Sequence, residues 1–170
     1  MSNAAAAPGS AGNRPSLIEH HNYRFLIMDA PTDTNLAAYV EQLKKFEVGV
    51  VVRACEPTYS SVPLKQNGID VLELPFPDGD PPPNEVVDQW LDLVQKTFES
   101  PGKTIAVHCV AGLGRAPVLV AIALIEKGMD PYDAIEFIRQ KRRGAINSRQ
   151  VTFLSQYRRR RGQSCFCVIQ

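Results

Sequence analysis

The sequence predicts a single α/β domain in which helices flank a mainly parallel central sheet. Short apolar runs of strand length alternate along the chain with longer segments whose apolar residues recur every three or four positions. Strands and helices that alternate in this way usually form a parallel sheet covered on both faces. The chain has 170 residues, of which 44% are hydrophobic, and is long enough for one domain with a substantial core.

The expected elements follow in chain order. Residues 1–16 are rich in Ala, Gly, Ser, Asn and Pro, so we expect a disordered tail there. The folded domain is expected over residues 17–157, with residues 158–170 as a basic tail. The first half of the domain is predicted to contain strands at residues 23–27, 48–52 and 69–74, a helix whose apolar face begins at Leu36, and a turn at Asn67-Gly68.

The second half begins with the segment Pro75–Pro83, which contains five prolines and is predicted to be a stiff loop. An amphipathic helix is predicted next, because Val86, Trp90 and Val94 lie on one face at helical spacing. Residues 104–107 are predicted to form a buried strand. Three further helices are predicted at residues 117–125, 131–140 and 148–157.

The strongest functional signal lies between the strand at 104–107 and the helix at 117–125. Cys109 follows the strand, and Arg115 opens the helix after a loop that contains two glycines. Backbone N–H groups of such a loop favour a bound anion and also favour the thiolate of Cys109. Arg115 offers a fork of donors that matches two phosphoryl oxygens. We therefore predict a nucleophilic Cys109 and a phosphate loop, defined as Cys109 together with the binding residues Val110, Ala111, Gly112, Leu113, Gly114 and Arg115.

Displacement of an alcohol or phenol from phosphorus also requires a proton for the leaving oxygen. Asp78 lies on the proline-rich loop and is predicted to be this general acid, with Asp80 as the alternative. A solvated turn residue before Gly79 is the other interpretation of Asp78. His108, which precedes the nucleophile, is predicted to support the phosphate loop through hydrogen bonds to its backbone.

Composition narrows the function classes. A net charge of +1 provides no overall basic field for nucleic acid. No apolar run reaches the roughly 18 residues of a membrane span, and the N-terminus lacks the apolar core of a secretory signal. The four cysteines have no framework spacing, which favours a reducing compartment.

The last residues of the sequence contain a lipidation motif. Cys167-Val168-Ile169-Gln170 matches the C-a-a-X pattern, in which a final Gln favours farnesylation of Cys167. A single lipid chain binds membranes weakly. Additional attraction to anionic lipid is predicted from four consecutive arginines, Arg158, Arg159, Arg160 and Arg161. We therefore expect the cytoplasmic face of the plasma membrane and endosomes, and the cytosol for unprenylated protein.

From about Leu17 onward, the chain resembles the PRL family (phosphatases of regenerating liver, protein tyrosine phosphatase type IVA). The resemblance rests on residues 52–59, 75–83, 108–117 and 141–147 and on the C-terminal motif. It implies a cysteine-dependent protein tyrosine phosphatase with the dual-specificity fold, without a metal or another cofactor. Cys109 would be the nucleophile, Arg115 the phosphate clamp and Asp78 the acid. The alanine-rich N-terminus, Pro77 and the short basic tail depart from the family pattern.

The resemblance also implies a redox partner and binding partners. Cys55 matches the second cysteine of the family, which forms a reversible disulfide with the nucleophile. Family members bind the cystathionine-β-synthase-pair domain of cyclin-M magnesium transport mediators and can form homotrimers. Ala116 stands where most relatives in the superfamily have Ser or Thr after the arginine, which predicts slow hydrolysis of a cysteinyl-phosphate.

Three functions remain open at this point. The leading hypothesis is a phosphatase that acts on phosphotyrosine-type monoesters of proteins. The second is a membrane-tethered binding module whose phosphocysteine state gates a cyclin-M type transport mediator. The third, a phosphoinositide phosphatase, is disfavoured, because such loops usually carry lysines where this one has Val110, Ala111 and Leu113.

Overall fold

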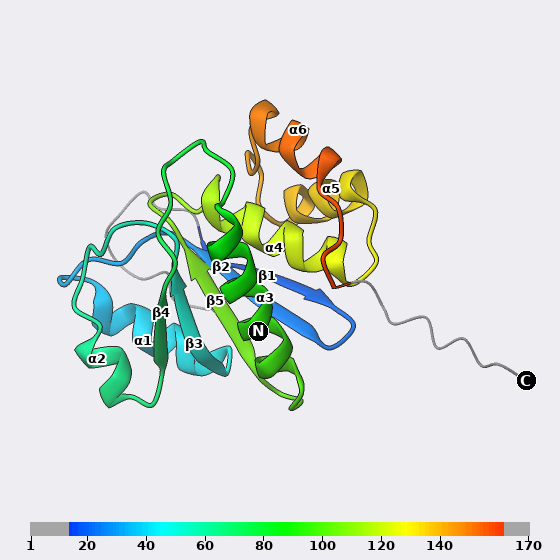
Figure 1. The fold of residues 1–170 in the computed structure, drawn as a ribbon. Coiled ribbons are helices and arrows are strands. Elements are labelled where there is room, and N and C mark those ends of the chain that lie inside the picture. The colour runs from blue at the N-terminus through cyan, green and yellow to red at the C-terminus, as the bar shows by residue number, and fades with distance from the viewer. Residues whose placement is uncertain (1–13, 162–170) are drawn as a thin grey trace, which may run out of the picture.

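A computed structural model describes residues 14–161 of the chain. Its centre is a five-stranded sheet with the strand order β1-β2-β5-β3-β4 (Figure 1). Strand β1 is antiparallel to β2, and all other neighbouring pairs are parallel. The strands are β1 (Ser16–His20), β2 (Tyr23–Met28), β3 (Val48–Arg53), β4 (Asp70–Glu73) and β5 (Thr104–His108). The predicted α/β domain with a mainly parallel sheet is confirmed.

Helices cover both faces of the sheet (Figure 1). The helices are α1 (Leu36–Lys45), α2 (Val62–Gln66), α3 (Asn84–Phe98), α4 (Arg115–Glu126), α5 (Pro131–Lys141) and α6 (Ser148–Gln156). One apolar cluster joins α3, α4, α5 and α6 to the sheet, and a second joins α1 and α2 to its other face. Helix α4 is buried on nearly all sides, so it forms the centre of the larger layer.

Two elements were not among those predicted. Strand β1 begins at Ser16, at the edge of the segment interpreted as a tail, and pairs with β2 across a turn at His21-Asn22. In β1 the apolar residues Leu17 and Ile18 are adjacent and are followed by Glu19 and His20, so the segment has no alternation of apolar and polar positions. Helix α2 has only five residues, which is shorter than the window over which helical periodicity can be recognised.

The topology places the ends of several strands next to the predicted site. Strand β5 lies between β2 and β3, and all five of its residues are buried. Residue Arg53 at the end of β3 is paired with His108 at the end of β5. The carboxyl ends of parallel strands meet at one edge of a sheet, where open α/β sheets usually bind ligands. No helix among residues 14–161 is long and apolar enough to cross a membrane.

Candidate active site

The phosphate loop connects the end of β5 to the start of α4 at this edge. Cys109 is buried, with 3% of its surface exposed, whereas Val110 beside it is 61% exposed. None of the backbone N–H groups of residues 110–114 donates a hydrogen bond to another residue within the described range. Unpaired N–H groups at the start of a helix are a binding site for an anion. The loop therefore offers free donors above a buried thiol.

Arg115 connects the phosphate loop to the proline-rich loop. Its Nη1 donates to the carbonyl oxygen of Phe76 at 3.1 Å, and Phe76 itself is buried. Its Nε lies 3.7 Å from Asp78 Oδ1 and donates no hydrogen bond within residues 14–161. The protein thus fixes part of the guanidinium, while the N–H of Nε is available to donate a hydrogen bond to an oxyanion.

The structure separates the two candidate acids. Asp78 faces Arg115 and the N-terminus of α4, yet its side chain is 80% exposed. Asp80 instead faces the exposed Arg149, with 3.9 Å between the charged atoms. Gly79 between them has a φ of +81°, a left-handed conformation that favours glycine. Of the two carboxylates, Asp78 is the one that lies next to Arg115 and Gly114 of the phosphate loop.

His108 is fully buried behind the nucleophile. Its Nδ1 lies 3.1 Å from the carbonyl oxygen of Cys109, and its Nε2 lies 2.7 Å from the hydroxyl of Tyr59. Burial lowers the pKa of His108 to about 4, so the ring is neutral near pH 7. A neutral ring has one N–H, which is satisfied if Nδ1 donates to Cys109 and Nε2 accepts from Tyr59.

A charged pair completes this network from β3. Arg53 donates to the carbonyl oxygen of Tyr59 at 2.6 Å and binds the carboxylate of Glu73. Its guanidinium carbon also lies 4.7 Å from the centre of the Tyr59 ring. Sequence reasoning missed the roles of Arg53 and Tyr59, because only the pairing of β3 with β5 brings them to His108.

Cys55 lies at the same edge of the sheet, two residues after β3. Its Sγ is 4.0 Å from His108 Nδ1, and the side chain is buried. Cys55 and Cys109 are both free thiols. Burial raises the pKa of Cys55, although the nearby Arg115 opposes that effect. Cys55 is therefore held as a neutral thiol near the nucleophile.

Gln150 on α6 is a second residue that sequence reasoning missed. Its Oε1 accepts from the N–H of Asn147 as part of the capping box of α6. Its Nε2 is buried and has no hydrogen-bond partner within residues 14–161. A Cβ atom at Gly114 would lie 3.1 Å from this Nε2 and 3.6 Å from Asp78 Oδ1. The unpaired amide thus borders the active site, next to both the loop and the acid.

The remaining sequence-predicted residues are placed as follows. Ala116 is fully buried in the first turn of α4, in the same apolar cluster as Cys109. The arginines Arg158–Arg161 follow α6, and two of them make ion pairs with α3. Cys167 and the rest of the lipidation motif lie outside the described residues.

Comparison with known proteins agrees with this geometry. A family model described as "Polymorphic toxin system, DSP-PTPase phosphatase" matches residues 27–129. "Protein tyrosine phosphatase type IVA 3" of Homo sapiens is 58% identical over 149 residues, which are 86% of each chain. "Probable protein tyrosine phosphatase type IVA A" of Dictyostelium discoideum is 52% identical over 154 residues, covering 90% of this chain and 93% of the relative.

A solved structure shows the same fold. The structure of a putative protein tyrosine phosphatase from Leishmania major superposes with a TM-score of 0.78 at 44% identity, covering 86% of this chain and all of that one. The sequence and the fold thus lead to one family. The chain belongs to the protein tyrosine phosphatase type IVA family, and it is a cysteine-dependent protein tyrosine phosphatase with the dual-specificity fold.

Proposed function

We propose that the protein hydrolyses phosphotyrosine-type monoesters through a cysteinyl-phosphate on Cys109. The thiolate attacks phosphorus, an S–P bond forms, and the P–O bond of the ester breaks. Asp78 gives its proton to the departing oxygen. Water then gives one proton to the Asp78 carboxylate and attacks the phosphoryl group; the S–P bond breaks, and inorganic phosphate leaves with the thiolate and the protonated Asp78 restored.

One observation carries this proposal. The buried thiol of Cys109 lies under a loop whose N–H groups at residues 110–114 have no partner among residues 14–161. Donors fixed toward developing negative charge stabilise a phosphoryl group in transfer. Arg115 adds a bidentate group and holds the carbonyl of Phe76, two residues before the acid.

We also propose that the second step is slow. A hydroxyl after the arginine can donate a hydrogen bond to the sulfur that leaves phosphorus, and the methyl group of Ala116 cannot. Loss of a hydrogen bond to a charged group costs about 1.5–3 kcal/mol, which corresponds to roughly tenfold to a hundredfold in rate. The phosphoenzyme should therefore accumulate during turnover.

Intact-mass measurement after brief exposure to para-nitrophenyl phosphate tests both proposals. The wild type should gain one phosphoryl group on Cys109, and Cys109→Ser should gain none. Ala116→Ser should shorten the lifetime of the adduct by at least about tenfold, whereas Ala123→Ser, which adds the same hydroxyl elsewhere on α4, should leave it unchanged. Equal decay in the wild type and Ala116→Ser would disprove the role of Ala116.

A long-lived phosphocysteine supports a second candidate function. A partner that binds the open loop could distinguish the free thiol from the phosphorylated one, and the exposed Val110 provides contact surface beside the nucleophile. We propose a cyclin-M type magnesium transport mediator as this partner. The proposal requires that phosphorylation of Cys109 change the affinity for the isolated partner domain, and equal affinity for both states would contradict it.

The family resemblance also supports a redox proposal and a membrane proposal. We propose that Cys55 resolves oxidised Cys109 into a disulfide, because a neighbouring thiol protects against irreversible oxidation. Peptide mapping after peroxide treatment should find the Cys55–Cys109 link rather than sulfinic acid at Cys109.

Farnesylation of Cys167 is proposed from its sequence motif, and Cys167→Ser should move the protein from the membrane fraction to the soluble fraction.

A further inference from the structure

The carbonyl groups of residues 110–113 in the phosphate loop are all bound from outside the loop. The donors, in order from Val110 to Leu113, are the N–H of Ala30 at 2.9 Å, Arg142 Nη2 at 3.1 Å, Arg142 Nε at 2.6 Å and the N–H of Ile146 at 2.8 Å. Each peptide unit is planar and trans, with its C=O and N–H on opposite sides. Holding the carbonyls on one side therefore turns the N–H groups to the other side, where an anion binds.

Arg142 provides two of these four bonds from a buried position at the end of α5. Its side chain is 2% exposed, and it binds the carbonyl oxygens of Ala111 and Gly112. A Cβ atom on Gly112 would lie 2.6 Å from Arg142 Nη2 and 2.6 Å from the carbonyl oxygen of Met28. The arginine thus packs directly against the loop backbone, and only glycine fits between Arg142 and β2.

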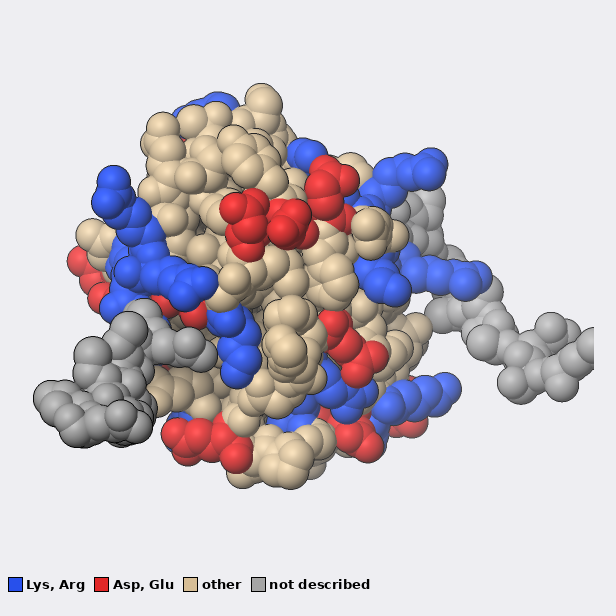
Figure 2. All heavy atoms as spheres, turned by 90° about the vertical axis from the view of Figure 1, so that its right-hand side faces the viewer, with Lys and Arg blue, Asp and Glu red and all other residues tan. Residues whose placement is uncertain are grey.

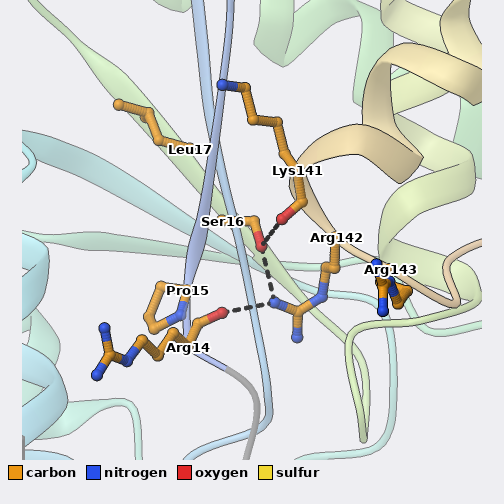
Figure 3. A pocket seen from close by; sticks show the side chains of 7 residues that line it. All are labelled: Arg14, Pro15, Ser16, Leu17, Lys141, Arg142 and Arg143. Carbon is orange, nitrogen blue, oxygen red and sulfur yellow. Dashed lines mark hydrogen bonds between the residues drawn. The ribbon is translucent and has the colours of Figure 1, made fainter.

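The rest of the guanidinium is bound by the protein on its other sides. Nη2 pairs with Asp29 at 2.7 Å, and Nη1 donates to the carbonyl oxygen of Arg14 at 2.8 Å and to Ser16 Oγ at 3.1 Å (Figure 3). Arg14, Ser16 and Arg142 also line a cavity of about 380 Å³ between the start of β1 and the end of α5. The cationic ends of Arg14, Lys141 and Arg143 point apart there (Figure 3).

These contacts exclude a direct role for Arg142 in binding substrate, because its donors are engaged by backbone carbonyls, Asp29 and Ser16. They also exceed what is needed to attach α5 to β1, for which Ser16 and the carbonyl of Arg14 suffice. The bonds to Ala111 and Gly112 act on the two peptide units whose N–H groups belong to Gly112 and Leu113.

We propose that Arg142 is a positioning residue that holds the N–H groups of Gly112 and Leu113 toward the bound phosphoryl group. The proposal deepens the proposed function, because it assigns to a residue outside the phosphate loop the conformation on which phosphoryl binding depends.

Two substitutions separate geometry from charge. Arg142→Lys keeps the positive charge but replaces the planar fork with one flexible ammonium group. Arg142→Gln loses the charge and keeps a planar amide with two N–H donors. Ser16→Ala is the matched control, because it removes a partner of the same guanidinium and leaves the bonds to Ala111 and Gly112 in place.

The measurement is the affinity for inorganic tungstate, a phosphate analogue, determined from the rise in melting temperature with tungstate concentration. Arg142→Lys and Arg142→Gln should each bind tungstate at least about tenfold more weakly than the wild type. Their Cys109 should also react more slowly with iodoacetamide at a fixed pH, whereas Ser16→Ala should react at the wild-type rate, because only the variants at position 142 turn the loop N–H groups away from the sulfur. Ser16→Ala should change the tungstate affinity by less than about twofold, even where it lowers the melting temperature.

Two outcomes would overturn the proposal. One is wild-type tungstate affinity in Arg142→Lys; if Arg142→Gln alone loses affinity, only the charge matters. The other is a loss of tungstate affinity in Ser16→Ala equal to that of the variants at position 142. If one variant at position 142 lacks a cooperative unfolding transition, the other carries the test. Tungstate binding does not require phosphoryl transfer. The proposed function is therefore contradicted by a different result, namely the absence of a phosphoryl adduct on Cys109 of the wild type.

Discussion

Asp78, which we propose as the general acid, combines an exposed side chain with a fixed position beside the phosphate loop. Its loop is rigid because of its prolines and is anchored by the buried Phe76, whose carbonyl is bound by Arg115. The carboxylate itself stays in solvent beside the phosphate loop. Residues 76–78 thus combine a fixed backbone with a carboxylate that a large leaving group can reach.

Asp78→Asn should affect substrates according to their leaving group. Phenyl phosphate needs a proton on its departing oxygen, so kcat/KM should fall at least about a hundredfold. An aryl phosphate with a strongly electron-withdrawing ring should lose far less. Asp80→Asn is the matched control, because Asp80 faces Arg149 instead. Parallel losses on both substrates would show that Asp78 is not the acid, and steady-state assays on both substrates would reveal this.

Gln150 presents the opposite situation, a buried amide with an unpaired donor. A buried donor without a partner costs stability. The position of the Gln150 amide beside Gly114 is explained if its Nε2 donates to an oxyanion or a water molecule bound in the active site. Gln150→Glu keeps the acceptor that caps α6 and replaces the donor with a negative charge.

The Gln150→Glu variant should therefore lose at least about tenfold in kcat/KM while its melting temperature stays near that of the wild type. Gln156→Glu, at the end of the same helix, is the control for the added charge. The role of the Gln150 amide would be disproved by an unchanged kcat/KM. Thermal unfolding shows whether the cap survives.

At the scale of elements, the edge of the sheet formed by β3 and β5 supports the phosphate loop through His108. Arg53 binds the backbone carbonyl of Tyr59, the Tyr59 hydroxyl bonds with His108, and His108 bonds with the Cys109 carbonyl. Tyr59 can donate to Nε2 only while the imidazole is neutral, because a protonated Nε2 no longer accepts.

The stability should therefore depend on pH through His108. Burial lowers its pKa to about 4, whereas an unfolded histidine has a pKa near 6.5. Between these values the unfolded chain binds a proton that the native protein does not, so stability rises with pH. The contribution is complete above about pH 6.5 and is lost as the pH falls toward 4, on the order of 3 kcal/mol in total.

Chemical denaturation of the wild type and of His108→Gln across this range isolates the effect, because the carboxylates titrate in both proteins. The free energy of unfolding should fall more steeply with decreasing pH in the wild type. If the two proteins show the same slope between pH 6.5 and 4, the imidazole is not held neutral.

Local patterns predicted the parts of the fold that depend on neighbours in sequence. The helix faces at α1 and α3 and the loop between β5 and α4 follow from spacing within a short window. The support of the loop does not, because Arg142 and Gln150 reach it from α5 and α6 across about thirty residues of chain. A buried arginine or glutamine looks the same in sequence as a solvated one. Its role is decided by which backbone carbonyl or glycine it meets after folding.

At the scale of the whole molecule, the arginines after α6 are held against the helical layer. The carboxylate of Glu126 at the end of α4 accepts from the backbone N–H groups of Arg160 and Arg161. Their side chains pair with Asp88 and Asp92 on α3 at 3.3 Å and 2.6 Å. Figure 2 shows basic and acidic side chains interspersed on one face of the molecule. Two of the four arginines proposed to bind membranes are paired with carboxylates of α3.

Release of these arginines should strengthen binding to anionic membranes. Asp88→Asn combined with Asp92→Asn removes both carboxylate partners on α3 and leaves two cations without a counter-charge there, each worth on the order of 1 kcal/mol near an anionic surface. Unprenylated protein should then bind vesicles that contain phosphatidylserine roughly thirtyfold more tightly. The gain should shrink at high salt, because exposed charges are screened.

The matched control is Asp70→Asn with Asp133→Asn, which changes the net charge equally at two exposed carboxylates outside α3. Stability should change little in either protein, because exposed ion pairs contribute about 0–1 kcal/mol. Cosedimentation with vesicles at two salt concentrations measures the affinity. Equal gains in both double variants would mean that only net charge matters and that α3 does not compete with the membrane. A gain confined to the α3 variant would show that the fold itself limits how strongly the basic segment binds lipid.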